Sequence, residues 1–128
     1  MIAAIVHARL GSSRLPGKVL MDISGKPLLS HVIERVKAAE TIDEVIVATT
    51  YEPQDAALRD FLEQQGVEMF LGQEHDVLDR VYQASKHFRA DVVARITPDD
   101  PFKDPEIIDR AVKLLIESNP PVDYVANC

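Results

Sequence analysis

Residues 2–6 read IAAIV, and after a single histidine residues 8–18 read ARLGSSRLPGK. The first segment is a short apolar run rich in β-branched residues, which is typical of a buried strand in a parallel sheet. The second contains three cations, two glycines and no acidic residue. Open α/β sheets bind ligands just beyond the carboxyl ends of their strands, where glycines let the backbone approach an anion and amides and cations hold phosphate. We therefore interpret residues 8–18 as a triphosphate-binding loop, and a polar surface loop is the alternative.

Two common phosphate-binding motifs do not fit this loop. A Walker A motif has four residues between its glycines and a Ser or Thr after its Lys. Here five residues separate Gly11 from Gly17, and Val19 follows Lys18. The dinucleotide-binding pattern G-x-G-x-x-G is also absent. The loop is therefore neither of these motifs.

Apolar periodicity along the chain predicts alternating strands and helices. Strands are expected at residues 2–6, 44–49, 67–71, 91–96 and 123–127, and a short extended piece at 19–23. Helices are expected at 27–39 with Pro27 at the first helical position, from 53 to a glycine cap at 66, after an N-cap at 76, and from 105 to the prolines after 119. This alternation predicts one α/β domain with right-handed βαβ units and a mostly parallel sheet.

Composition and net charge restrict the classes of molecule that this protein can bind. The formal net charge of −7 argues against a general nucleic-acid binder, although residues 1–21 carry three cations and no carboxylate. An acidic protein with one cationic loop attracts small anions to that loop, so a nucleotide polyphosphate fits better than a duplex. No apolar run is long enough for a membrane span, and the single Cys128 excludes an internal disulfide. We expect a cytoplasmic protein with no membrane partner. Self-association as a homodimer is a further expectation, because exposed sheet edges pair readily.

Residues 8–18 resemble the signature A-R-x-G-S-x-R-L-P-G-K of the cytidylyltransferase family, which includes the acylneuraminate and 3-deoxy-manno-octulosonate cytidylyltransferases. The SpsF-like spore-coat polysaccharide proteins are the most similar branch. The likeness continues in order through GKP at 25–27, VATT at 47–50, DVLDR at 76–80 and RITPD at 95–99. It implies a Rossmann-like three-layer α/β/α domain of the nucleotide-diphospho-sugar transferase type. Members are typically longer, so we expect residues 1–128 to be the nucleotide-binding part of a longer enzyme, incomplete at its C-terminus.

The resemblance also implies an activity and a set of site residues. The activity would be transfer of CMP from CTP to a sugar acid, with release of pyrophosphate and with Mg²⁺ as cofactor. Arg14 and Lys18 are the expected catalytic phosphate ligands. The residues expected to bind the nucleotide are Ala8 and Leu10 through their backbones, Arg9, Gly11, Ser12, Thr49 and Arg80.

Two of these assignments, and the role of His7, leave alternatives open. Arg9 either binds phosphate or braces the loop through a carboxylate. Arg80 either contacts the nucleotide or pairs with Asp76 across one helical turn, which stabilises a helix by only a few tenths of a kcal/mol. His7, at the end of the first strand, either touches ligand or is a structural histidine.

Asp99 is the expected metal ligand. The family pattern resembled here is roughly R-I-T-G-D-C-P, whose Asp binds the metal, and Mg²⁺ needs only one or two carboxylates beside phosphate oxygens. This chain departs from that pattern with Pro98 and Asp100. The alternative is that both aspartates cap the next helix or form a turn. A second metal carboxylate of the family has no counterpart before Cys128.

Two other functions stay open at this point. One is a glycosyltransferase that uses a nucleotide-sugar donor on a similar architecture. The other is a nucleotide-binding module that is inactive in isolation. No spacing among the histidines makes a zinc site, and no hydrolase motif surrounds Ser12 or Ser13.

Overall fold

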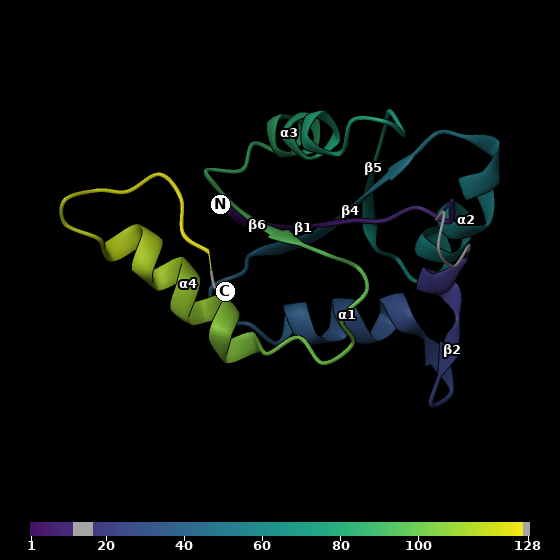
Figure 1. Ribbon diagram of the computed structural model, residues 1–128, viewed down its shortest axis with the longest axis horizontal. Helices are drawn as coiled ribbons and strands as arrows, with labels where there is room; N and C mark the ends of the chain where they lie inside the picture. Colours follow the sequence, from purple (N-terminus) through teal and green to yellow (C-terminus); the bar gives the residue numbers. More distant parts are fainter. Residues whose placement is uncertain (12–16, 127–128) are drawn as a thin grey trace.

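A parallel four-stranded sheet forms the centre of the molecule (Figure 1). The computed structural model describes residues 1–11 and 17–126. The strand order is β5-β4-β1-β6, and every neighbouring pair is parallel. The strands are β1 (Ile2–His7), β4 (Glu44–Thr50), β5 (Glu68–Gly72) and β6 (Val92–Ile96). A small antiparallel pair, β2 (Asp22–Ile23) and β3 (Lys26–Pro27), lies outside this sheet.

Helices cover both faces of the sheet, as the alternation of strands and helices predicts. They are α1 (Leu28–Lys37), α2 (Ala56–Gln64), α3 (Val77–His87) and α4 (Pro105–Glu117), with short 3-10 helices η1 (Lys18–Leu20) and η2 (Pro53–Asp55). Buried residues of α1, α2 and α4 share one apolar cluster, and those of α3 share the cluster on the opposite face. Figure 1 shows α3 on one side of the strands and α1 and α4 on the other. The predicted α/β/α layering is confirmed.

Strand β1 is central because both of its faces are apolar. Residues 3–6 are fully buried: Ala4 and Val6 belong to the cluster with α1, and Ala3 and Ile5 to the cluster with α3. A strand covered on both sides reads as a continuous apolar run rather than an alternating one, which is the pattern of residues 2–6. The loop that follows β1 therefore leaves the middle of the sheet.

Several predicted boundaries are confirmed. Gly66 has φ 68°, the left-handed conformation expected of the cap after α2. The Asp76 side chain accepts a hydrogen bond from the Asp79 backbone N–H and caps α3. Pro105 begins α4.

Three local predictions are wrong. Residues 19–23 form a strand only at 22–23, because the amides of Leu20 and Met21 donate to the carbonyls of Gly17 and Lys18 and close the 3-10 turn η1. Pro27 is the N-cap of α1 with ψ 148°, not its first helical residue. Helix formation after 53 begins as the 3-10 turn η2 and becomes α-helical only at Ala56.

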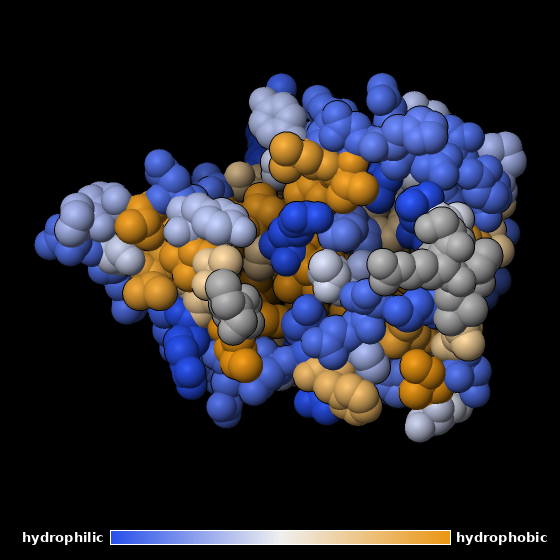
Figure 2. Space-filling view, in the orientation of Figure 1, coloured by the Kyte–Doolittle hydropathy of each residue, from blue (hydrophilic) through white to orange (hydrophobic). Residues whose placement is uncertain are grey.

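The predicted fifth strand at 123–127 is also wrong for its described residues. Residues 123–126 lie in no strand, and residue 127 is outside the described part. Tyr124 is 82% exposed, so this stretch has no sheet face to pack on, and apolar periodicity alone does not supply one. Figure 2 shows hydrophobic residues gathered over α4 and the stretch after it, where Leu114, Ile116 and Val122 are exposed. In residues 1–11 and 17–126, no helix is long and apolar enough to cross a membrane.

Candidate functional site

The neck of the loop after β1 is closed by two hydrogen bonds of one residue, Leu10. Its carbonyl accepts from the Gly17 amide at 2.9 Å, and its own amide donates to Asp55 Oδ1 at 2.7 Å. Gly17 has φ 75°, which a residue with a Cβ adopts only with strain. Ser12 and Arg14 of the predicted site lie in residues 12–16, outside the described residues. The structure therefore fixes where this loop leaves and rejoins the domain.

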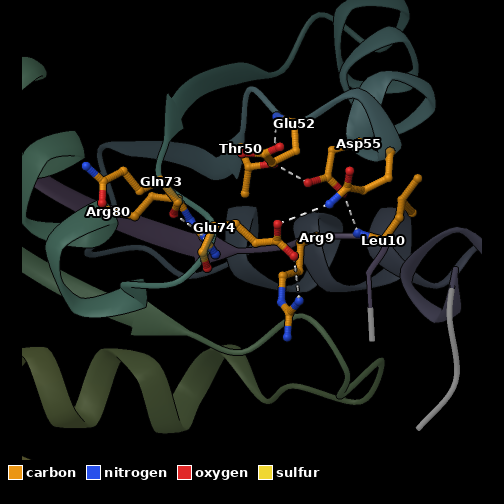
Figure 3. A network of polar contacts seen from close by, with 9 residues as sticks. Arg9, Leu10, Thr50, Glu52, Asp55, Gln73, Glu74 and Arg80 are labelled. Atoms are coloured by element: carbon orange, nitrogen blue, oxygen red, sulfur yellow. Dashed lines mark hydrogen bonds and ion pairs between the residues drawn. The ribbon is translucent and has the colours of Figure 1, made fainter. Parts of the chain in front are cut away.

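Asp55 connects that neck to the end of the neighbouring strand β4. Its side chain is buried, with the residue 1% exposed, and its Oδ2 accepts a hydrogen bond from the Thr50 hydroxyl. The Thr50 oxygen in turn accepts from the Glu52 amide at 3.1 Å. Figure 3 shows Asp55 between Leu10 and Thr50. Asp55 was not predicted as a site residue, because its position at the end of η2 carries no pattern of its own.

Arg9 is engaged with a carboxylate. Its Nη1 lies 3.2 Å from Glu74 Oε1 (Figure 3). The other oxygen of Glu74 accepts from Gln54 Nε2 at 3.1 Å. Of the two roles considered for Arg9, the contact with Glu74 corresponds to bracing the loop through a carboxylate. The Glu74 partner was not predicted. Gly11 lies against the same pair, because a Cβ placed on it would be 3.6 Å from both Arg9 Nη1 and Glu74 Oε1.

Arg80 is buried and supports the loop between β5 and α3. It is 1% exposed, and its Nη1 donates to the carbonyls of Gln73 at 2.9 Å and Glu74 at 3.3 Å. Burial lowers the pKa of this guanidinium, and the nearby Arg9 adds to that shift. The side-chain pair with Asp76 does not form within the described residues, since Asp76 is used to cap α3 instead. Nucleotide contact by Arg80 stays a prediction.

Gly72 makes room for Arg80. A Cβ on Gly72 would lie 2.8 Å from Arg80 Cγ, closer than real Cβ contacts. The buried arginine stem therefore packs against Gly72 at the end of β5, which the register of the sheet places beside Thr50 of β4. Gly72 was not predicted as a site-shaping residue, because only the packed structure shows what its missing side chain would meet.

Lys18 and Asp99 come together at the end of the sheet from different strands. Lys18 begins η1 after the β1 loop, and Asp99 lies in the turn after β6. Lys18 Nζ is 3.9 Å from Asp99 Oδ2, and both side chains remain about half exposed. A cation and a carboxylate that are both accessible suit a ligand carrying phosphate and a metal ion. The structure thus brings these two predicted site residues together, and their roles stay predictions.

The neighbouring aspartates separate into different roles. Asp104, not Asp99 or Asp100, caps α4 by accepting from the Glu106 amide at 2.9 Å. Asp100 Oδ1 accepts from the Phe102 amide at 2.9 Å, so the turn role considered for it is observed. No group of three or more metal-binding side chains occurs in the parts of the chain that the structure describes. Asp99 alone still fits Mg²⁺, which takes one or two carboxylates and completes its shell with phosphate and water oxygens.

Two predicted nucleotide-binding positions lie inside the protein. Thr49 is fully buried and its hydroxyl has no hydrogen-bond partner among the described residues. Ala8 is 2% exposed and its amide donates to the Ala48 carbonyl at 3.0 Å. For both, contact with a nucleotide stays a prediction.

His7 behaves as a neutral side chain. Its Nε2 is buried without a partner among residues 1–11 and 17–126. Burial, followed by the charges of Arg95 and Arg80, lowers the pKa of His7 from 6.5 to about 4. The imidazole therefore carries no charge at neutral pH, and the positive charge at this end of the sheet comes from arginine and lysine.

The fold and this site define a Rossmann-like α/β domain whose polar residues gather beyond the carboxyl ends of its strands. The family model described as cytidylyltransferase matches residues 3–128, and the chain belongs to this family.

Relatives and solved structures agree with this assignment. The chain is 33% identical to the spore coat polysaccharide biosynthesis protein SpsF of Bacillus subtilis over 98% of its own length and 54% of that protein. It is 38% identical to 3-deoxy-manno-octulosonate cytidylyltransferase of Geobacter sulfurreducens over 94% of its own length and 47% of that protein. The chain thus spans about half the length of these relatives.

Among solved structures, a cytidylyltransferase from Leptospira borgpetersenii superimposes with a TM-score of 0.84 and 32% identity, covering 90% of this chain and 48% of that one. A CMP:2-keto-3-deoxy-manno-octonic acid synthetase in complex with CTP gives a TM-score of 0.78 and 29% identity, covering 92% and 48%. Both confirm the fold predicted from the sequence.

Proposed function

We propose that this chain forms the CTP-binding part of a magnesium-dependent cytidylyltransferase that transfers CMP from CTP to a sugar acid. The product would enter the synthesis of surface polysaccharide or another glycoconjugate in the cytoplasm. The observation that carries the proposal is the approach of Lys18 to Asp99 at 3.9 Å, beside the loop that carries the family signature. Membership of the family and likeness to 3-deoxy-manno-octulosonate cytidylyltransferase support the choice of CTP and a sugar acid.

The reaction requires positioning and charge neutralisation more than covalent chemistry. A hydroxyl oxygen of the sugar attacks the α-phosphorus of CTP, the bond from that phosphorus to the bridging oxygen breaks, and pyrophosphate leaves with the bonding electrons while the hydroxyl loses its proton. Lys18 would neutralise phosphate charge as a compact cation, and Arg14 would add a planar donor. Asp99 would hold Mg²⁺, which when bound neutralises charge on the phosphates and the leaving group.

Arg9 and Arg80 would act differently from Lys18. In the structure Arg9 is paired with Glu74, and Arg80 is buried on the carbonyls of Gln73 and Glu74. Their proposed contribution is to hold the β5–α3 loop against the base of the β1 loop. A preformed binding site avoids the cost of ordering loops when the nucleotide arrives.

The experiment that tests the proposal is calorimetry of the chain with CTP in Mg²⁺ and in EDTA, with UTP, ATP and GTP as comparison nucleotides. Pyrophosphate release is then measured with CTP, Mg²⁺ and a panel of sugar acids. We expect binding that prefers CTP and requires Mg²⁺, and pyrophosphate that appears only with a sugar acid. Hydrolysis of a nucleotide-sugar without pyrophosphate from CTP would contradict the proposal and favour the glycosyltransferase alternative.

A second candidate is a nucleotide-binding unit that needs the remainder of a longer enzyme for turnover. Two observations favour it. The chain spans only about half the length of these relatives, and Asp99 is the one carboxylate assigned here to the metal. Tight Mg²⁺–CTP binding without pyrophosphate release from any sugar acid would identify this case.

A further inference from the structure

We infer that Asp55 is a positioning residue that sets the neck of the β1 loop for the nucleotide, an inference that rests on the proposed function. Asp55 is not among the residues expected to contact the nucleotide or the metal, and it acts through Leu10, whose backbone is expected to do so. Its two carboxylate oxygens instead connect two separate segments: Oδ1 accepts from the Leu10 amide at 2.7 Å, and Oδ2 accepts from the Thr50 hydroxyl. The loop that leaves β1 is thereby tied to the end of β4.

The connection reaches Lys18 through the backbone. Leu10 is held by Asp55 at its amide, and its carbonyl accepts from the Gly17 amide at 2.9 Å. Gly17 is the N-cap of η1, whose first residue is Lys18, and the Leu20 amide donates to the Gly17 carbonyl at 3.1 Å. A displacement of Leu10 therefore displaces Gly17 and the start of η1. Asp55 acts on the phosphate-binding cation through this chain of backbone contacts.

Burial makes this contact specific. Asp55 is 1% exposed, so water does not take the place of the carboxylate as acceptor for the Leu10 amide and the Thr50 hydroxyl if the carboxylate is removed. A buried amide without an acceptor is unfavourable, and the loop neck can restore its hydrogen bonds only by moving toward solvent. An asparagine at this position keeps an oxygen for the Leu10 amide and turns its NH₂ toward the Thr50 oxygen. An alanine keeps neither contact.

The chain offers a matched control. Asp109 on α4 is also a carboxylate that accepts from backbone amides, those of Glu40 and Thr41, and from the Thr41 hydroxyl. It lies near the opposite ends of the strands, since Glu40 and Thr41 precede β4 while Asp55 follows it. Asp109→Ala therefore removes a comparable set of hydrogen bonds away from the β1 loop.

The test compares Asp55→Ala, Asp55→Asn and Asp109→Ala by thermal unfolding and by calorimetry with Mg²⁺–CTP. We expect Asp55→Ala to weaken CTP binding at least tenfold, Asp55→Asn to stay within about threefold of wild type, and Asp109→Ala to lower Tm without changing affinity. Asp55→Glu, which keeps the charge but lengthens the side chain, replaces the alanine variant if that variant does not fold, and should weaken binding likewise. If folded Asp55→Ala, or folded Asp55→Glu in its place, binds CTP with the same affinity as wild type, the inference is overturned.

Amide hydrogen exchange separates this inference from the proposed function. The amides of Leu10 and Gly17 should exchange slowly in wild type and in Asp55→Asn, and much faster in Asp55→Ala or Asp55→Glu, with no nucleotide present. If wild type binds no CTP, the proposed function fails, and accelerated exchange at both amides still supports Asp55 as the residue that holds the neck. Unchanged exchange at Leu10 and Gly17 in the folded variant overturns it in either case.

Discussion

Lys18 Nζ lies 3.9 Å from Asp99 Oδ2, although Lys18 follows the central strand β1 and Asp99 follows the edge strand β6. The two strands are parallel neighbours, with Val6 beside Ile96. The segments that follow them therefore begin at the same end of the sheet, beyond the carboxyl ends of the strands. Both side chains remain accessible, and a phosphate and its metal ion can therefore be held by the same pair. This relationship is the basis for the first two predictions.

Replacing Lys18 with alanine should weaken Mg²⁺–CTP binding and leave the fold intact. The ion pair with Asp99 is exposed, so its loss should cost only about 0–1 kcal/mol of stability. If Lys18 acts as one preorganised donor in the transition state, turnover should fall on the order of 10²–10³-fold. Calorimetry and a pyrophosphate assay measure the two effects. Lys37→Ala, in the last turn of α1 before β4, is the charge-matched control and should change neither.

Asp99→Asn should abolish the Mg²⁺ dependence of CTP binding, because an amide is a poor ligand for this hard cation compared with a carboxylate. The measurement is CTP affinity across a magnesium titration. Asp100→Asn is the adjacent control: its carboxylate accepts from the Phe102 amide, and an asparagine oxygen preserves that contact. Identical magnesium curves for Asp99→Asn and wild type would remove Asp99 from the site.

His7 should make the protein less stable as the pH falls from about 6.5 to about 4. The folded pKa of His7 is depressed by burial and by Arg95 and Arg80, so the unfolded chain binds this proton first and stability declines on acidification. One such group contributes at most about 1.4 kcal/mol per pH unit. Denaturant unfolding at several pH values measures this effect. Between about pH 6.5 and 4, the free energy of unfolding of His7→Gln should fall less than that of wild type. His75→Gln, at an exposed histidine, should follow the wild-type curve.

Gly72→Ala should destabilise the fold by about 1–3 kcal/mol, as overpacking usually does. The new Cβ would lie 2.8 Å from Arg80 Cγ, and Arg80 is buried and held by two carbonyls. Gly11→Ala is the contrasting variant, since its Cβ would meet Arg9 and Glu74 only at 3.6 Å, an ordinary contact. Urea unfolding should therefore separate the two glycines, and a smaller loss at Gly72 than at Gly11 would contradict the packing argument.

The order of strands and helices was predictable because each depends on local patterns. An apolar run marks β1, helical spacing marks α1, and single residues such as Gly66 and Asp76 mark helix ends. Local patterns also produced the errors. Residues 123–127 have the composition of a strand, but a strand needs a neighbour and a buried face, and the described residues 123–126 have neither.

The candidate site was predictable only in part. Lys18 and Asp99 were both predicted as site residues, each in the segment that follows a predicted strand, and the structure brings them together. The supporting residues Asp55, Glu74 and Gly72 were missed because their contacts with Leu10, Arg9 and Arg80 follow no recognisable sequence pattern. The spacing of Arg80 and Asp76 suggested a helical pair, yet burial turned Arg80 toward loop carbonyls that needed a donor.

The amino-acid sequence by itself determined the layered α/β fold, the family and the place where the loop of residues 8–18 leaves the sheet, because hydrophobic periodicity and short motifs act over a few residues. Only the tertiary structure decided that Arg9 pairs with Glu74, that Asp55 fastens Leu10, and that Lys18 faces Asp99. Those contacts depend on which strands become neighbours and in what register, and burial then leaves each polar group few partners to choose from.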